Sequence, residues 1–379
     1  MHKTFLKELA TRALLVPKKI FTKGLGWLVS RLYFYLVSPG LLRSAAAYIY
    51  EQYASNKNSQ KEKTLYCVLD LEYCSVTFDT VSRLAVCDLH RHRLGHTHIH
   101  PIIVPGKLDG VREEMPEYQS VVNVSERIWR IENMMVPIFR LLPSCKSYTR
   151  LENRSDIKHF LKDKASILPS IYSLTFPCAL SNNVTQTLKK TSQAVVDCFR
   201  ARAEEIQQIK EYIKNTSGKR KTIIISLRQY DYMKERNSNL ESWIAFASYL
   251  QKNNYSPIFV PDIDLAKNGI PEKMKQFPIC LEASYNIETR MALYQEAWLN
   301  MAIAHGPMEL CWYNKKCRYA LFVKPSSSPQ MQARALKRNG LVLNEQPVFA
   351  AAYQKWVWEK DDLNIIKKVF HEMEKELLT

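Results

Sequence analysis

Arginine side chains that could bind a diphosphate follow an apolar run in the second half of this chain. Arg228 stands directly after the run 222–227 (TIIISL), and Arg236 lies in the same polar loop, residues 228–239. A guanidinium offers a fork of N–H donors that matches a phosphate group. The loop therefore predicts a phosphate contact. The alternative is a surface loop that carries two ordinary arginines.

A second candidate phosphate contact is the tripeptide His305-Gly306-Pro307, which follows the apolar run 299–304. Glycine lets a ligand approach the backbone, and proline pre-shapes the first turn of a helix. A histidine at this turn can donate a hydrogen bond to a phosphate or leaving-group oxygen. Glu309 falls in the same first turn. The alternative is a turn shaped only by its glycine and proline.

Other polar residues of this region stand at predicted strand ends or helix starts, where they could contact a nucleotide: Asn239, Asp262, Ser284 and Arg290. Asn239, Asp262 and Ser284 also have a structural explanation. Asparagine and serine cap helices, and an aspartate after a strand often forms a turn.

The elements expected around these residues alternate between strands and helices. Apolar runs predict strands at 222–227, 257–261, 299–304 and 318–323. A helix with Trp243, Phe246, Ala247 and Leu250 on one face follows the first of them. Mostly apolar strands that alternate with helices predict a parallel sheet covered on both faces. Ligands bind at the carboxyl ends of the strands in such sheets.

The first half of the chain repeats this pattern. We predict strands at 65–71 and 98–104, joined by a helix near 78–93. Asp70 and Glu72 lie at the carboxyl end of the first strand, where a carboxylate could serve as general base on an acceptor hydroxyl. Arg112 is expected on the same acceptor side. The alternative for Asp70 is a strand-end aspartate that accepts from neighbouring backbone N–H groups.

Composition indicates a globular protein with one unusual end. The 379 residues are 46% hydrophobic, which is enough for two domains with cores. Lys and Arg number 54 against 37 Asp and Glu, a net charge of +17. Residues 1–63 hold 11 Lys or Arg and 3 Glu, so 11 − 3 gives +8 there. The nine cysteines include no CxxC pair and predict buried, reduced thiols.

The basic end predicts a helical arm, residues 1–60, that lies on a membrane surface. Its apolar stretches, 24–30 and 32–42, are broken by Arg31 and are too short to span a bilayer. Basic and aromatic residues interleave over the first ~45 positions, which favours contact with anionic lipid. The alternative is a basic helix packed on the protein itself.

Residues 222–323 resemble the donor-binding half of GT-B glycosyltransferases, which have two Rossmann-like domains and use nucleotide-activated sugars. The order of segments SLR, basic loop, helix, FVPD, RMALYQE, LNMAIAHGP and RYALFV is similar to fucosyltransferase-like and heptosyltransferase-like members. The resemblance implies that Arg228 and His305-Gly306-Pro307 contact the donor diphosphate. There is no paired-arginine HxRR-type motif, and the single Asp-x-Asp sequence is Asp262-Ile263-Asp264. The resemblance implies a metal-independent reaction without a cofactor.

The fold class expected is therefore α/β, with two Rossmann-like domains in a GT-B arrangement. We expect an acceptor domain at 61–205 and a nucleotide-sugar donor domain at 206–345. The resemblance implies that C-terminal helices at 346–379 pack back on the first domain.

The function expected is transfer of a sugar from a nucleotide-diphosphate donor to a glycan or lipid-linked acceptor, in surface polysaccharide synthesis. The enzyme would be cytoplasmic, peripheral on the inner face of the membrane, with no nucleic acid partner. Alternatives are a nucleotide-sugar epimerase of the same fold and a non-catalytic basic protein that binds membrane or nucleic acid. A cleft lined by Asp70, Glu72 and Arg112 would favour catalysis, whereas a continuous basic face with exposed aromatic residues would favour nucleic acid.

Overall fold

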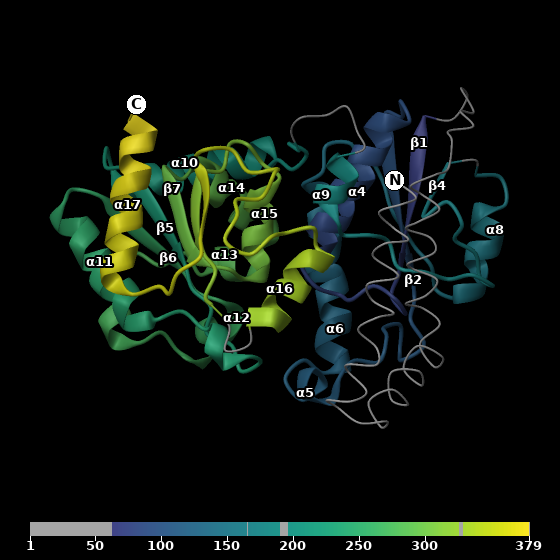
Figure 1. The fold of residues 1–379 in the computed structure, drawn as a ribbon, viewed down its shortest axis with the longest axis horizontal. Helices are drawn as coiled ribbons and strands as arrows, with labels where there is room; N and C mark the ends of the chain where they lie inside the picture. The colour runs from purple at the N-terminus through teal and green to yellow at the C-terminus, as the bar shows by residue number, and fades with distance from the viewer. Residues whose placement is uncertain (1–62, 165, 190–195, 326–328, 379) are drawn as a thin grey trace.

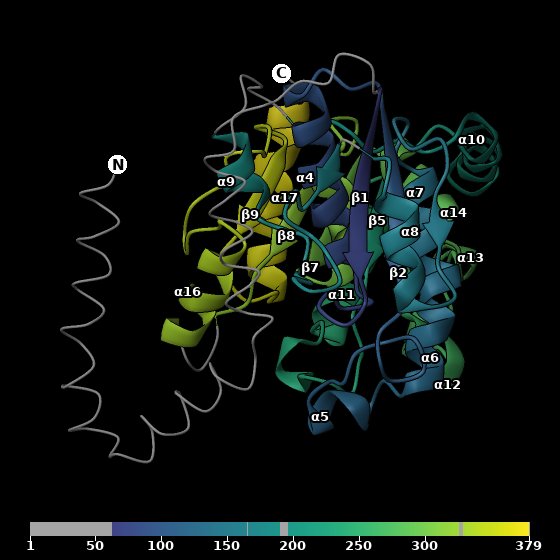
Figure 2. The ribbon, with the colours of Figure 1, turned by 90° about the vertical axis from the view of Figure 1, so that its right-hand side faces the viewer.

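Two α/β domains lie side by side in the computed structural model, each built on its own parallel sheet (Figure 1). The structure describes residues 63–164, 166–189, 196–325 and 329–378. The predicted arm, residues 1–60, and its membrane contact lie outside the described residues. Figure 2 looks from the side of the first domain, with β1 and β2 in front of the strands of the second sheet.

The first sheet has the order β3-β2-β1-β4, and every neighbouring pair is parallel. Its strands are β1 (Thr64–Asp70), β2 (His98–Val104), β3 (Thr149–Arg150) and β4 (Ile167–Leu168). The strands β1 and β2 pair over their whole length, so the carboxyl ends of both reach the same edge. Both predicted strands are confirmed within one residue at each end.

Helices cover this sheet and lead toward the second domain. They are α4 (Asp79–Arg93), α5 (Pro116–Gln119), α6 (Val124–Arg130), the π-helical η1 (Ile131–Met135), α7 (Val136–Arg140), the 3-10 turn η2 (Arg154–Asp156), α8 (Ile157–Leu161) and α9 (Val184–Leu188). The helix α4 connects β1 to β2, which completes the predicted βαβ unit.

The second sheet has the order β6-β5-β7-β8-β9 and is parallel throughout, as predicted. Its strands are β5 (Thr222–Ser226), β6 (Ser256–Val260), β7 (Leu299–Ile303), β8 (Tyr319–Phe322) and β9 (Gln354–Val357). Every residue of β5, β6, β7 and β8 is buried, because helices cover both faces.

The helices of the second domain are α10 (Ala203–Ser217), η3 (Lys234–Arg236), α11 (Leu240–Lys252), α12 (Ile263–Asn268), η4 (Glu272–Met274), α13 (Glu282–Tyr285), α14 (Ile287–Glu296), η5 (Gly306–Met308), α15 (Glu309–Trp312), α16 (Pro329–Arg338) and α17 (Leu363–Leu378). The predicted apolar face of α11 is confirmed, since its buried residues are Trp243, Phe246, Ala247 and Leu250.

The C-terminal segment differs from the prediction that residues 346–379 pack back on the first domain. Residues 354–357 form the edge strand β9 of the second sheet, and α17 packs beside α11 (Figure 1). Phe370 of α17 lies 5.1 Å from the ring of Tyr255 and 5.6 Å from that of Phe246. Contacts between Phe370 and aromatic rings of the second domain therefore keep α17 on that domain.

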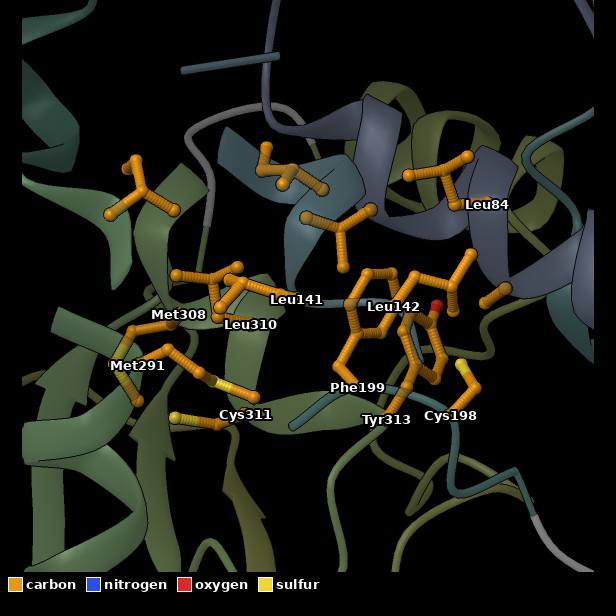
Figure 3. Packing of buried hydrophobic residues seen from close by; sticks show 14 of the residues in the cluster. Leu84, Leu141, Leu142, Cys198, Phe199, Met291, Met308, Leu310, Cys311 and Tyr313 are labelled. Atoms are coloured by element: carbon orange, nitrogen blue, oxygen red, sulfur yellow. The ribbon is translucent and has the colours of Figure 1, made fainter. Parts of the chain in front are cut away.

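The two domains share one buried apolar cluster, which holds them against each other (Figure 3). Leu84 of α4 and Leu142 after α7 belong to the first domain, whereas Met291, Leu310 and Tyr313 belong to the second. This packing brings α4 toward α15 and α7 toward α14. It places the carboxyl ends of β5 and β7 opposite the start of α4.

The cysteines are all free, as predicted, and all are buried except the half-buried Cys145. Within the described ranges, no helix is both long enough and apolar enough to cross a membrane.

Candidate functional site

A cavity of about 350 Å³ lies between the two domains, at the carboxyl ends of the strands of the second sheet. All predicted donor-side residues except Asn239 line it: Arg228, Arg236, Asp262, Ser284, Arg290, His305, Gly306, Pro307 and Glu309. Residues far apart in the sequence therefore meet in one site. They meet because β5, β6 and β7 are neighbours in the sheet and end at the same edge.

Arg228 is 7% exposed and has no ion pair with a carboxylate of the described chain. Its Nη1 donates to the Met233 carbonyl at 3.1 Å and to Asn237 Oδ1, and its Nη2 donates to the Tyr232 carbonyl. A guanidinium has five N–H donors, so its Nε–H and one Nη2–H remain for a ligand. These donors could contact a phosphate oxygen. Burial, and then the nearby Arg236, lower the pKa of Arg228 to about 10, so it is still a cation at neutral pH.

Arg236 joins this loop to the turn that follows β7. Its Nη2 donates to the Ala304 carbonyl at 3.2 Å, one residue before His305. The two loops predicted to bind phosphate are therefore adjacent, and they bring two guanidinium groups to one wall of the cavity.

His305 is 7% exposed, and its Nε2 is buried without a hydrogen-bond partner among the described residues. Burial, and then the charges of Arg290, Arg228 and Arg236, hold the pKa of His305 well below its usual range. The imidazole is therefore neutral at pH 7. A neutral ring with a free nitrogen can bind a ligand oxygen without adding charge, provided that this nitrogen carries the proton.

Asp262, Ser284 and Arg290 line the cavity but use their polar atoms to shape its wall. Asp262 caps α12 by accepting from the Leu265 N–H at 2.9 Å and also accepts from the Gln229 N–H. Ser284 Oγ donates to the Pro261 carbonyl at 2.7 Å, and Arg290 donates to the same carbonyl at 3.3 Å. Burial raises the pKa of Asp262 to about 6. Asp262 therefore caps a helix and shapes a turn, the structural role given above as the alternative to a nucleotide contact.

Asn239 lies outside the cavity lining. Its Oδ1 accepts from the Ser242 N–H at 3.3 Å and so caps α11. Its backbone N–H donates to Asp361 at 2.7 Å. The start of α11 is therefore covered by the C-terminal part of the chain, and Asn239 has the capping role that was its alternative.

Asp70, Glu72 and Arg112 also lie outside the cavity, so the expectation that they line the cleft is not met. Asp70 is fully buried: Arg154 binds it with two N–H groups at 2.7 Å, and Tyr172 donates to it at 2.6 Å. The Glu72 N–H donates to Asp70 Oδ1 at 3.0 Å. Asp70 therefore accepts from a neighbouring backbone N–H, the structural role given above as the alternative to a general base. The Glu72 carboxylate accepts from the Lys107 N–H at 2.8 Å. Arg112 pairs with Glu114 at 2.6 Å.

The first domain instead presents two acids to the cavity: Glu126, which pairs with Arg130 at 2.6 Å, and Asp79, in the first turn of α4. Its side chain is 40% exposed and lies 3.8 Å from Arg83. The sequence does contain a sign of this position, because Asp79 begins the predicted helix that follows the first strand. An acid in the first turn of a helix is usually explained by the helix dipole, which hides such a role.

Further residues of the first domain complete the cavity: Thr77, Phe78, Tyr118, Glu126, Trp129, Arg130, Asn133 and Met134. Arg130 bridges the domains, donating to the Tyr230 hydroxyl at 3.1 Å and to the Tyr118 hydroxyl at 3.2 Å. Tyr118 and Tyr232 pack edge to face across the same boundary, with ring centroids 5.2 Å apart. The lining holds both signs of charge, so the cavity is not part of a continuous basic face.

Among the residues that the structure describes, no group of three or more His, Cys, Asp or Glu side chains could hold a metal ion.

Comparison with known proteins identifies the fold. No family model matches the sequence, and no curated protein matches it. A glycosyl transferase family 9 structure from Veillonella parvula is similar with a TM-score of 0.51 and 11% identity, over 83% of this chain and 97% of that chain. The E. coli ADP-heptose lps heptosyltransferase II is similar with a TM-score of 0.51 and 10% identity, over 83% of this chain and 98% of that chain. These likenesses, and the two parallel sheets that face one cavity, show that this chain has the GT-B-like fold that its donor-half segments predicted.

Proposed function

We propose that this protein is a glycosyltransferase that moves a sugar from a nucleotide-diphosphate donor to a hydroxyl of a glycan or lipid-linked acceptor. One observation carries the proposal. Arg228 and Arg236, neither paired with a carboxylate of the described chain, form one wall of an interdomain cavity whose opposite wall presents Asp79. A site for an anion thus faces a site for a base. The similar structures support the fold on which this proposal rests.

The donor diphosphate would bind between Arg228, Arg236 and the turn at His305-Gly306-Pro307. Charge develops on the diphosphate as the bond to the sugar breaks, and preorganised cations stabilise that charge most. The Nε and Nη2 hydrogens of Arg228 that have no partner among the described residues would donate to the diphosphate, and the neutral imidazole of His305 lines the same cavity without adding charge. No cofactor is needed beyond the donor.

The nucleoside would lie toward α12 and α13, where Ile263 and Tyr285 line the cavity. Tyr285 is 39% exposed and offers an aromatic face for a base. Asp262 and Ser284, which the sequence predicted as possible nucleotide contacts, line the same cavity.

The acceptor hydroxyl would approach from the first domain, with Asp79 as general base. The hydroxyl oxygen forms a bond to the anomeric carbon while the bond from that carbon to the diphosphate oxygen breaks. The electron pair leaves on the nucleoside diphosphate, and Asp79 receives the hydroxyl proton. Asp79 suits this role better than Asp70, because the latter is fully buried and bound by Arg154 and Tyr172.

A panel of ADP, CDP, GDP, UDP and dTDP, measured by calorimetry against the full chain, tests this proposal. We expect one or more to bind at micromolar to millimolar concentration, and the corresponding nucleoside to bind more weakly. The matching nucleotide sugars then separate transfer to an added acceptor from epimerisation of the donor. If no nucleoside diphosphate binds at millimolar concentration, the proposal fails and a non-catalytic basic protein becomes the better explanation.

We infer the cellular location and the role in surface polysaccharide synthesis from the composition of residues 1–45. Their basic and aromatic composition supports attachment to the cytoplasmic face of a membrane, where surface polysaccharide acceptors are lipid-linked. Flotation with anionic liposomes should carry the full chain but not a chain that lacks these residues. Equal flotation of the two would exclude this attachment.

A further inference from the structure

Two carboxyl groups approach each other across the domain boundary in this cavity. Asp79 comes from the first turn of α4 in the first domain, and Glu309 is the first residue of α15 in the second. Both line the large cavity, and both also line a neighbouring cavity of about 10 Å³. The pair therefore forms part of the wall between these two spaces.

The surroundings of Asp79 favour its charged form. Its side chain is 40% exposed to solvent, and Arg83, one turn later in α4, lies 3.8 Å away. The helix α4 is 15 residues long, so its positive N-terminal end also stabilises a carboxylate in the first turn.

The surroundings of Glu309 favour its neutral form. Its hydrogen-bond partner in the described chain is a neutral hydroxyl, Ser82 Oγ, at 2.9 Å. Ser82 is in turn 3.0 Å from the Tyr313 hydroxyl, so three protonable oxygens follow one another from α4 to the end of α15. The Ser82 hydrogen bond and the charge of Arg83 both favour the ionised form, whereas burial and the nearby Asp79 favour the neutral form more strongly. The Arg83 Nε is held by the Leu180 carbonyl at 3.1 Å.

The small cavity behind the pair adds no positive charge. Its remaining lining residues are Ser82, Asn182, Trp312, Tyr313, Asn339, Leu341 and Phe349, all neutral. The donor-side cations Arg228 and Arg236 line the large cavity only. Two carboxylates that share one site do not both ionise readily, and the less stabilised one keeps its proton.

We propose that Asp79 and Glu309 share a single negative charge across the domain boundary, with Glu309 holding the proton. Glu309 is then a positioning residue: by staying neutral it keeps Asp79 ionised as the base and admits the diphosphate beside it. This inference rests on the proposed function for the role of Asp79. Burial, and then the Asp79 charge, raise the pKa of Glu309 to about 8, in agreement with the geometry.

This arrangement predicts an alkaline limit for donor binding. Above pH 8 Glu309 ionises, and a second negative charge then faces the bound diphosphate. The affinity for a nucleoside diphosphate should fall by about threefold to tenfold for each pH unit above 8, with tenfold expected if only the neutral form binds. The diphosphate itself is fully ionised across this range, so its own titration does not interfere.

The experiment measures binding of the nucleoside diphosphate chosen from the panel above, by calorimetry from pH 7.5 to 9.5. The wild-type chain should lose affinity as the pH rises above 8. Glu309→Gln keeps the size and cannot ionise, so its affinity should stay nearly constant to about pH 9, with only a small loss toward pH 9.5 as Arg228, whose pKa is about 10, begins to lose its proton. Asp79→Asn removes the charge that holds the proton on Glu309, so the decline should begin at a lower pH.

Glu288→Gln is the matched control. Glu288 is also buried at the domain boundary, but its neighbours are basic, with Arg140 and Arg202 both at 3.3 Å. This variant should keep the wild-type decline. If the wild type binds equally well at pH 7.5 and 9.5, or if Glu309→Gln declines like the wild type, the shared charge is excluded while the proposed function stands. If no nucleoside diphosphate binds at any pH, the proposed function itself is lost.

Discussion

A Cβ atom placed on Gly306 would lie 2.6 Å from Cδ2 of Phe78. Gly306 belongs to the turn after β7 in the second domain, and Phe78 directly precedes α4 in the first. The predicted donor turn and the helix that carries Asp79 therefore touch through a glycine. A side chain at position 306 would separate the two walls of the cavity.

Gly306→Ala should consequently destabilise the closed arrangement by about 1 to 3 kcal/mol, the usual cost of overpacking. The loss should be smaller in a chain that also carries Phe78→Ala, since the ring that meets the new methyl group is then absent. Urea unfolding of the two single variants and the double variant measures this coupling. Additive effects would show that the two residues do not contact each other in solution.

Arg228→Ala should weaken nucleoside-diphosphate binding by roughly 1.5 to 3 kcal/mol, the range for hydrogen bonds to a charged group. Affinity for the nucleoside alone should change far less, because the base and ribose would lie toward α12 and α13, away from the guanidinium, in the proposed complex. Calorimetry with both ligands separates these effects. Lys234→Ala is the control, since this exposed lysine of the same loop pairs with Asp231 and does not line the cavity. A similar loss of affinity in both variants would point to a change of the whole loop.

Asp70→Asn should lower the free energy of unfolding. It leaves Arg154 and Tyr172 facing a neutral amide in a fully buried site, and removal of one partner from a buried ion pair costs about 3 to 5 kcal/mol. Chemical denaturation measures the loss. Wild-type stability together with a large loss of turnover would restore Asp70 as the candidate base.

Asp79→Asn should show the opposite pattern. A general base contributes about 100-fold or more to turnover, so kcat should fall by at least that factor. Its ion pair with Arg83 is long, at 3.8 Å, and is partly exposed on the Asp79 side, so the unfolding midpoint should fall much less than in Asp70→Asn. Steady-state kinetics with the donor and acceptor identified above provide the measurement. Undiminished turnover would exclude Asp79.

Glu309 should make stability depend on pH even without a ligand. Its pKa is raised in the folded chain, so the folded state keeps a proton that the unfolded chain has lost above about pH 5. The stabilising effect of that proton is greatest at low pH and disappears as the pH rises through about 8. The stability of Glu309→Gln relative to wild type should therefore increase from pH 5 to 9, as measured by urea midpoints. A constant difference would contradict the raised pKa.

The sequence alone determined the strands and one wall of the site. The runs 222–227 and 299–304 are apolar throughout because both faces of the sheet are covered, and this pattern is local enough to recognise. The carboxyl ends of parallel strands meet at one edge, so Arg228 and His305 could be placed together without a structure.

The other wall was decided by tertiary structure. Asp70 ends β1, and Glu72 and Asp79 follow it, and their residue types do not say which one faces the second domain. Arg154 lies 84 positions beyond Asp70 and takes up its charge, which leaves Asp79 at the cavity.

The position of the last helix has the same kind of cause. Its apolar stripe was visible in the sequence, but a stripe does not specify which surface covers it. Phe370 packs on Phe246 and Tyr255 of the second domain, so the helix stays there and does not return to the first domain. Local patterns determine elements and strand ends, whereas contacts between distant residues decide which charges are neutralised and which remain for chemistry.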